Sequence, residues 1–357
     1  MNADAIIECV PNFSEGMDEE KVRAIVASMN VEGVRLLDWS RDEAHNRSVV
    51  TIAGAPEAVV EAAIRAVGKA AQLIDLTRQS GVHPRIGAAD VVPFVPVSGI
   101  SLAECAMLAR QAGLQIWRRF GVPVYFYGAA AARPDRVQLE DVRRGQFEGL
   151  RDAAVKDAMR RPDVGGPELH PKAGASAVGA RSFLIAYNLY IGQPGEPGQA
   201  GVAGAGPAAP IAEIVSVGEG AMAVGRRSRG KRESIRTLDG GLLPMQPDIA
   251  AARAIARDLR ASNGGLNGVK ALGLIANGRA QISMNITDYR VTPMKQVYAA
   301  VKELATRHGV QITDGELIGL IPEGAFEPDS DWVRQTREFD PEAKVLERRL
   351  HVPLAWP

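Results

Sequence analysis

The sequence predicts an α+β fold in which two subdomains each follow the order β-α-β-β-α-β. Apolar runs typical of strands alternate with amphipathic runs typical of helices in that order as far as Val97. The same order returns after Ser182, where Asn277 and Gly278 give a strong hairpin signal between two strand-like runs. This is the order of ferredoxin-like sandwiches, so we expect a mixed sheet in each half.

The first half supplies these elements in a regular succession. We predict strands at 6–10, 34–39, 48–53 and 90–97, and helices at 18–29 and 56–80. Pro56 suits a first helical turn and Gly81 suits a C-terminal cap. Pro93 and Pro96 cannot donate to a ladder, so the strand at 90–97 should lie at a sheet edge or beside a cleft. A helix with a capping box at 101–104 and a strand at 122–127 follow.

The second half repeats the order around an insertion. We predict strands at 182–191, 269–276, 280–287 and 310–313, and helices at 248–261 and 293–307. The stretch 192–247 is rich in Gly, Pro and Ala and then basic, which favours a flexible, solvated insertion over a binding patch. The predicted units are therefore 1–178, 179–326 with this insertion, and a charged tail at 327–357 that covers a surface or a partner subunit.

Composition restricts the class of protein. The 357 residues carry 42 basic and 42 acidic side chains, which gives no reason to expect nucleic acid or an anionic membrane as a partner. Two cysteines, Cys9 and Cys105, suit a reducing cytoplasm. The first residues lack a basic region typical of a secretory signal, and no apolar run approaches the length of a membrane span.

The stretch 81–94 concentrates reactive side chains. His83, Arg85 and Asp90 fall within eight positions, separated by glycine and proline. Because the predicted helix ends just before His83, its negative end should help this imidazole accept a proton, as a general base must. The alternative is a structural histidine that is hydrogen-bonded within a loop.

Several motifs together resemble the formiminotransferase family. They are Glu-Cys-Val-Pro-Asn-Phe-Ser-Glu-Gly (8–16), Asn-Arg-Ser-Val (46–49), the stretch 81–94, Pro-Asp-Val-Gly (162–165), His-Pro-Lys-Ala-Gly-Ala (170–175), Gly-Ala-Arg-Ser-Phe-Leu-Ile-Ala-Tyr-Asn (179–188) and Ala-Gln-Ile-Ser-Met-Asn (280–285). They occur in order and cover nearly everything from residue 5 to about residue 326 apart from the insertion. A resemblance of this length is far more specific than a single glycine-rich motif.

The resemblance implies a function and a site. The family transfers a formimino group between glutamate and N5 of tetrahydrofolate in histidine degradation, and it is typically a homodimer with two subdomains around a folate-binding cleft or tunnel. By this resemblance His83 is the catalytic histidine. The folate-contacting loop would comprise Gly165, Gly166, Pro167, Glu168, Leu169, His170, Pro171, Lys172, Ala173 and Gly174. The vertebrate cyclodeaminase domain has no counterpart here, which implies a stand-alone form.

The reaction assigns roles to further residues. His83 would take a proton from the attacking amine and return it to the leaving nitrogen, with Asp90 or Asp42 orienting the ring. Anionic substrates suit guanidinium groups. The predicted partners of the substrates are Arg85, Arg47 and Arg181 for carboxylates, Lys172 for the folate tail, and Asn12, Asn46 and Asn188 for amide or pterin edges. Each also has a structural alternative, as an ion pair or a turn cap.

Other functions remain open at this point. A folate-binding or scaffold protein could keep the fold and lose turnover. Cys9 and His83 could form a thiolate–imidazolium pair of an amidine hydrolase, although Cys9 falls in an apolar strand where inert cysteines are common. The five histidines show no metal-ligand spacing, so we expect no metal.

Overall fold

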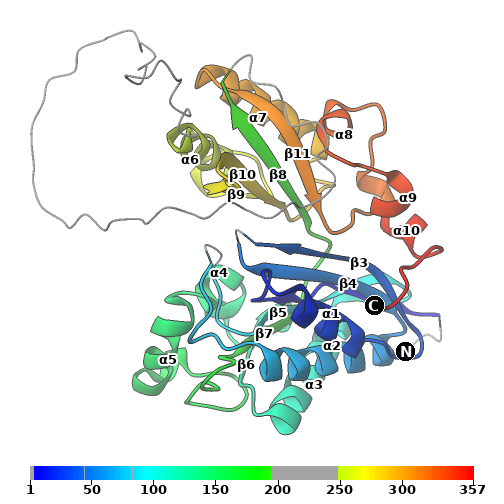
Figure 1. The fold of residues 1–357 in the computed structure, drawn as a ribbon, viewed down its shortest axis with the longest axis vertical. Helices are drawn as coiled ribbons and strands as arrows, with labels where there is room; N and C mark the ends of the chain where they lie inside the picture. The colour runs from blue at the N-terminus through cyan, green and yellow to red at the C-terminus, as the bar shows by residue number, and fades with distance from the viewer. Residues whose placement is uncertain (1–3, 44, 82–83, 194–247) are drawn as a thin grey trace, which may run out of the picture.

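A computed structural model describes residues 4–43, 45–81, 84–193 and 248–357, which form two lobes, each built on one sheet (Figure 1). The first lobe has a seven-stranded sheet and the second a four-stranded sheet. No helix in these ranges is long and apolar enough to cross a bilayer. The predicted α+β class with two subdomains is confirmed.

The first sheet contains the predicted β-α-β-β-α-β unit. Its strands are β1 (Ile6–Cys9), β2 (Asn12–Phe13), β3 (Val34–Asp42), β4 (Arg47–Gly54), β5 (Ala89–Ser98), β6 (Val124–Gly128) and β7 (Ser176–Ala180). The order is β1-β4-β2-β5-β7-β6, with β3 on the outer side of β4. The antiparallel neighbours β3, β4, β1 and β5, together with α1 (Glu19–Ser28) and α2 (Pro56–Leu73), realise the predicted unit, and β7 and β6 extend it in parallel.

The predicted edge position of the strand at 90–97 is wrong, because β5 lies inside the sheet. β1 and β2 pair with one side of β5 and β7 with the other. The sheet tolerates Pro93 because it lies opposite the break between β1 and β2, where Val10 donates its N–H to the Pro93 carbonyl at 3.3 Å. Pro96 is paired with Ile7 beside a register shift between β1 and β5. A register shift opposite Asn12 and Phe13 also leaves Asp90 as an extra residue in β5. Such a bulge re-aims a side chain.

The helix α2 ends earlier than the sequence predicts, at Leu73 rather than at residue 80. After it, the Asp75 carboxylate accepts the Thr77 N–H at 3.0 Å, and Leu76 donates its N–H to the distant Lys172 carbonyl at 2.9 Å. The helix dipole therefore does not act directly before residue 83, and this part of the argument for a base is wrong. The next helix, α3 (Leu102–Phe120), has the predicted capping box.

The second lobe confirms the repeated order. Its elements are β8 (Ile185–Gly192), α6 (Ile249–Leu259), β9 (Val269–Ala276), β10 (Arg279–Ile286), α7 (Met294–Arg307) and β11 (Gln311–Ile318). The antiparallel sheet has the order β11-β8-β10-β9. Asn277 and Gly278 have φ of 51° and 70°, the left-handed conformation that a tight hairpin turn requires. Residues 194–247, most of the predicted insertion, lie outside the described residues.

The segment after β11 returns to the first lobe (Figure 1). It forms α8 (Asp331–Gln335), α9 (Pro341–Lys344) and α10 (Leu346–Arg349). Leu346 and Leu350 pack with Leu37 of β3, and Leu354 donates its N–H to the Leu36 carbonyl at 2.7 Å. The tail thus covers a surface of its own chain. Residues 181–184 join the sheets, so the predicted boundary after residue 178 falls within β7.

Candidate active site

The inner face of the first sheet is polar and meets the second lobe. Residues that are directly opposite each other in a ladder point to the same face of the sheet. Asp42 is opposite Arg47 and Glu8 is opposite Ala53. Arg47 and Ala53 lie an even number of positions apart on β4, so all four side chains share one face. On this face Ala53 packs against Leu320, the residue that follows β11 by two positions. The core-facing side chains of the same strands pack under the helices of the first lobe. Polar residues on the inner face therefore lie between the lobes.

A small cavity gathers five of the predicted residues. Its volume is about 10 Å³, and its lining consists of Asn12, Phe13, Ser14, His45, Asn46, Arg47, Gln79, Arg85 and Asp90. Asn12, Asn46, Arg47, Arg85 and Asp90 were predicted, and they come from three separate stretches of sequence. The space is about what one water molecule needs, so a substrate requires the surrounding groups to make room. The predicted folate cleft stays a prediction.

Asp90 is a buried carboxylate with both oxygens engaged. Oδ1 accepts the Ile86 N–H at 2.7 Å, and Oδ2 accepts from the guanidinium of Arg143, which follows the short helix α4 (Leu139–Val142). The bulge in β5 aims the side chain at these partners. Asp90 therefore fixes the start of β5. If Asp90 also orients His83, its carboxylate must do so while it keeps the contacts to Ile86 and Arg143.

Arg85 is also saturated. Nε donates to the Gln79 side chain at 2.6 Å, and Glu148 of α5 (Gln146–Lys156) accepts both Nη1 at 3.1 Å and Nη2 at 2.9 Å. The Gln79 carbonyl and the Gln146 side chain take the remaining donors. A substrate carboxylate would have to displace Glu148. This geometry favours a positioning role over the predicted substrate contact.

Arg47 is a cation that lines the cavity, and its surroundings favour an anionic ligand. Burial, together with the neighbouring charge of Arg143, lowers the pKa of Arg47 to about 10, and Asp90 and Asp42 act in the opposite direction. The group still carries a full charge at neutral pH. Because that charge is poorly hydrated, an incoming carboxylate would be strongly favoured beside it.

The two asparagines of the cavity have structural partners. Asn46 accepts the Gly16 N–H at 2.9 Å and donates to the Ser80 carbonyl at 2.7 Å, so it ties the loop after β2 to the stretch before residue 82. Asn12 donates to the Val10 carbonyl at 2.9 Å. The predicted turn-capping alternative therefore describes Asn46 well, and its amide is not available to read a pterin edge without losing these bonds.

His83 lies outside the described residues, but its flanks reach the cavity. Gly81 packs so closely on the backbone of His45 and the side chain of Asn46 that an added Cβ would lie 2.5 Å from the His45 carbonyl oxygen. Arg85 lines the cavity from the other side. Asp42, a predicted orienter of His83, contacts His45, with 2.7 Å between its Oδ2 and the ring Nδ1.

The predicted folate loop packs beside the segment that follows His83. Ala88 donates its N–H to the Ala173 carbonyl at 2.9 Å, and Ala175 donates to the Ile86 carbonyl at 3.0 Å. Gly165 and Gly166 have φ of 77° and 84°. An added Cβ at Gly165 would lie 2.6 Å from the Trp117 ring, so this glycine serves packing rather than the expected approach of a flat ligand. The loop does not line the small cavity.

Three predicted ligands of the substrates lie elsewhere. Arg181 follows β7, and its charge acts on Glu8 and on the Tyr127 hydroxyl. Asn188 lies on β8 of the second lobe and donates to Glu316 at 3.3 Å. Lys172 is exposed and 3.8 Å from the Asp75 carboxylate. None of the three lines the small cavity.

Cys9 does not have the environment of a nucleophile. It is fully buried on the core side of β1, and burial raises the pKa of its thiol well above the ordinary value. A thiolate is therefore strongly disfavoured at neutral pH. Among the described residues no group of three or more His, Cys, Asp or Glu side chains could hold a metal ion.

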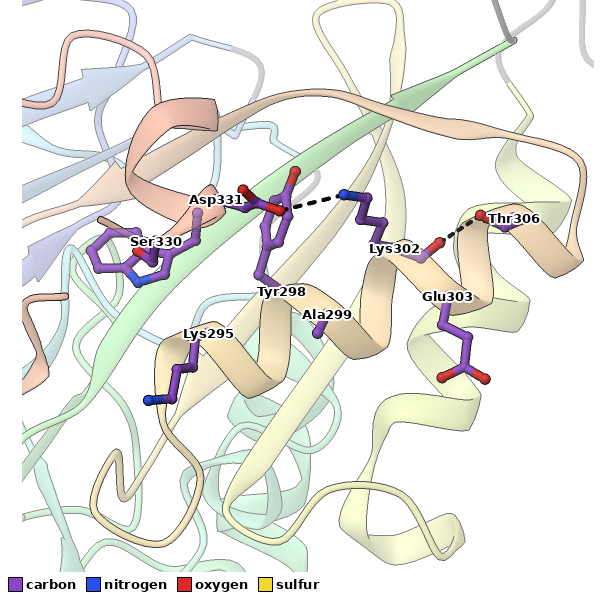
Figure 2. A pocket seen from close by; sticks show the side chains of 9 residues that line it. Lys295, Tyr298, Ala299, Lys302, Glu303, Thr306, Ser330 and Asp331 are labelled. Carbon is purple, nitrogen blue, oxygen red and sulfur yellow. Dashed lines mark hydrogen bonds and ion pairs between the residues drawn. The ribbon is translucent and has the colours of Figure 1, made fainter. Parts of the chain in front are cut away.

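A larger depression of about 470 Å³ lies on the outside of the second lobe (Figure 2). It lies between α7 and α8, and its lining includes Lys295, Tyr298, Lys302, Asp331 and Trp332. Lys302 contacts Asp331 at 3.4 Å and Lys295 contacts Glu327 at 3.3 Å, so both cations are paired. None of the predicted site residues lines it.

Sequence reasoning missed the residues that hold the site together. Arg143 and Glu148 fall in a charged stretch without periodicity, and only the fold brings them to Asp90 and Arg85. The pair Asp42 and His45 had a usable signal, because the two residues flank a turn at a spacing of three.

Comparisons with known proteins agree with this architecture. Residues 6–181 match the model of the formiminotransferase domain, N-terminal subdomain, and residues 227–349 match that of the formiminotransferase domain. A glutamate formimidoyltransferase of Streptococcus pyogenes is 34% identical over 97% of this chain and 98% of its own length. One of Thermoplasma acidophilum is 36% identical over 97% of both chains.

A bifunctional relative shows where the match stops. The formimidoyltransferase-cyclodeaminase of Rattus norvegicus is 34% identical over 89% of this chain but only 50% of its own length. The chain therefore spans about half the length of this bifunctional relative and nearly the whole length of the two glutamate formimidoyltransferases. With two domain models in order and identities above 30% over almost its full length, the chain belongs to the formiminotransferase family.

Proposed function

We propose that the protein is a glutamate formimidoyltransferase, which transfers the formimino group between N-formimino-L-glutamate and N5 of tetrahydrofolate in histidine degradation. Tetrahydrofolate is then a cosubstrate, and the enzyme works as a cytoplasmic homodimer. The observation that carries the proposal is the alignment over 97% of the chain with two stand-alone proteins of this name. The Arg47 guanidinium, which lines the cavity, supports an anionic substrate.

The proposed chemistry is an amidine form of acyl transfer. N5 attacks the formimino carbon, a tetrahedral intermediate forms, and the bond from that carbon to the glutamate nitrogen breaks. His83 takes the proton that N5 loses and returns it to the leaving nitrogen, so protons balance. Arg47 binds a glutamate carboxylate, and residues 165–174 contact the folate. Asp90 and Arg85 position the stretch that carries His83.

The test compares wild type, His83→Ala and the control His308→Ala, in which an exposed histidine of the second lobe is replaced. Product is measured as the 5,10-methenyl compound formed on acidification, and tetrahydrofolate binding is measured separately. We expect His83→Ala to lose at least about a hundredfold in turnover while it still binds tetrahydrofolate. His308→Ala should match wild type.

Other outcomes would overturn parts of the proposal. Wild-type turnover in the His83→Ala variant would remove the base. Tetrahydrofolate binding without turnover in any variant would favour a folate-binding or scaffold protein. Breakdown of N-formiminoglutamate without tetrahydrofolate, abolished by a Cys9→Ala substitution that leaves folding intact, would favour the hydrolase. The burial of Cys9 argues against this outcome.

A further inference from the structure

The inner face of the second sheet carries a compact polar patch, defined here as Asn188, Tyr190, Gln281 and Glu316. Gln281 of β10 is the ladder partner of Tyr190, and Glu316 of β11 is the partner of Asn188, so the four side chains share one face across three strands. The alternate residues of the same strands pack in the core under α6 and α7. The polar patch has no part in that core.

Gln281 is an anomaly within the polar patch. Gln281 is fully buried, and neither its amide nitrogen nor its amide oxygen makes a hydrogen bond of normal geometry within the described residues. Its contact with the Tyr190 hydroxyl, whose pKa it lowers, is too loose to count as one. A buried amide without partners costs stability, so its presence points to a group that is bound during function.

Glu316 is a carboxylate without a cation in the part of the chain that the structure describes. One of its oxygens accepts from Asn188 at 3.3 Å and from the Tyr190 hydroxyl at 3.4 Å. The nearby Asp314, by contrast, is paired with both Arg279 and Arg337. Two neutral donors orient the Glu316 carboxylate without neutralising its charge, which is the arrangement of a cation-binding group.

The polar patch faces the cavity side of the first lobe. Burial raises the pKa of Tyr190 to about 12, the Glu316 carboxylate adds to the rise and Arg337 opposes it, and the negative charge of Asp42 in the first lobe makes a smaller contribution that also raises this pKa. Asp42 contacts His45, which lines the cavity, and is the ladder partner of Arg47. Directly after β11, Gly319 lies beside β4, since an added Cβ would lie 3.7 Å from the Thr51 hydroxyl.

The chemistry of the two glutamyl substrates matches these two surfaces. Glutamate carries an ammonium group and N-formiminoglutamate an amidinium group on the same carbon, and both carry carboxylates. We propose that Glu316, with the Gln281 amide beside it, binds this shared cationic nitrogen, while the first lobe binds a carboxylate through Arg47. The inference rests on the proposed function, which it deepens by assigning the substrate's cationic end to the second lobe.

The experiment compares two ligands that differ only in the cation. Binding of L-glutamate and of glutarate, which lacks the amino group, is measured by calorimetry on the full chain. The variants are wild type, Glu316→Gln and Glu303→Gln, the last a control on the exposed surface of α7. We expect Glu316→Gln to weaken L-glutamate binding at least about tenfold and to leave glutarate binding unchanged. Glu303→Gln should change neither.

A second variant tests the amide. Gln281→Leu should lower L-glutamate affinity while the protein unfolds at the same urea concentration as wild type or at a higher one, because no internal hydrogen bond is lost. A fall in stability would show that the amide serves the fold instead, and would overturn its part in the inference.

The outcomes separate this inference from the proposed function. Wild type that transfers the formimino group but whose L-glutamate affinity is unchanged in Glu316→Gln overturns only the inference. Equal losses for L-glutamate and glutarate also overturn it, because they show a general distortion. Wild type that neither binds these ligands nor transfers the group overturns the proposed function and the inference together.

Discussion

The guanidinium of Arg143 is paired with the carboxylate of Asp90, and the two side chains are largely shielded from water, with 14% and 4% of their surfaces exposed. The pair links the end of α4 to the bulge in β5, and Asp90 itself lines the cavity. Burial makes the pair dependent on both members, because either charge alone would lie in a poorly solvated place.

Asp90→Asn should therefore lower the free energy of unfolding by about 3 kcal/mol, since it leaves a buried guanidinium without its counter-charge. Urea unfolding measures the change. Asp152→Asn, at an exposed aspartate that pairs with Arg151, is the control and should stay within about 0.5 kcal/mol of wild type. Equal stabilities of the two variants would mean that the buried pair contributes nothing.

Arg85→Lys tests a positioning role against substrate binding. Lysine cannot reproduce the two parallel contacts to Glu148 together with those to Gln79, so the 81–94 stretch should lose its alignment. We expect kcat to fall about tenfold or more with little change in the KM for N-formiminoglutamate. Glu148→Gln should reduce kcat in the same direction. A raised KM at constant kcat would instead show that Arg85 binds the substrate.

Glu8 predicts a dependence of stability on pH. Burial raises the pKa of this carboxyl from 4.5 to about 7, with Glu347 adding to the rise and Arg181 opposing it. The folded state therefore holds the proton more tightly than the unfolded state. The resulting stabilisation is complete below pH 4.5 and is lost as the pH rises to about 7. The unfolding free energy should fall over this range by up to about 3 kcal/mol from this group.

Glu8→Gln should remove that contribution, because glutamine does not titrate. Urea unfolding at several pH values between 5 and 8 gives the slope, and Glu32→Gln, at an exposed glutamate, provides the control. If the slope of Glu8→Gln equals that of the control, Glu8 is not the titrating group.

Gly16→Ala should disturb the site through the backbone alone. An added Cβ would lie 2.3 Å from the Asp42 carbonyl oxygen and 2.5 Å from the Arg47 nitrogen, so the turn between β3 and β4 must move. We expect about 1–3 kcal/mol of destabilisation and a loss of activity. Gly149→Ala, inside α5 with open space around it, should stabilise by about 0.5–1 kcal/mol. Thermal unfolding and turnover together decide, and similar behaviour of both variants would contradict this steric argument.

The sequence was sufficient for the order of elements because periodicity and the Asn277–Gly278 turn are local signals. It misplaced β5 because a proline costs a ladder hydrogen bond only where a neighbouring strand would accept one. The break between β1 and β2 lies opposite Pro93, and this break is a property of the assembled sheet. It extended α2 too far because a carbonyl at Lys172, far along the chain, pairs with the residues that follow the helix.

The structure brings part of the predicted site together, and the functional roles of its residues stay a prediction. Asn12, Asn46, Arg47, Arg85 and Asp90 do line one cavity. From residue type alone, Asn46 and Arg85 were expected to bind substrate. In the structure the Asn46 amide is hydrogen-bonded to Gly16 and Ser80, and the Arg85 guanidinium is bound to Glu148. Long-range partners of this kind have no trace in local sequence.

The contact of the C-terminal segment with β3 affects how the protein can be synthesised. Arg349 donates to the Leu37 carbonyl at 2.8 Å, and the two residues are 312 positions apart in the chain. On the ribosome the first sheet emerges and pairs internally long before this contact exists, which leaves the outer edge of β3 open. Exposed strand edges recruit other chains. The edge of β3 in the nascent first lobe therefore stays exposed until the C-terminal segment has been synthesised. During that time, chaperone binding to β3 would raise the yield of native protein, and a longer delay in translation would lower it.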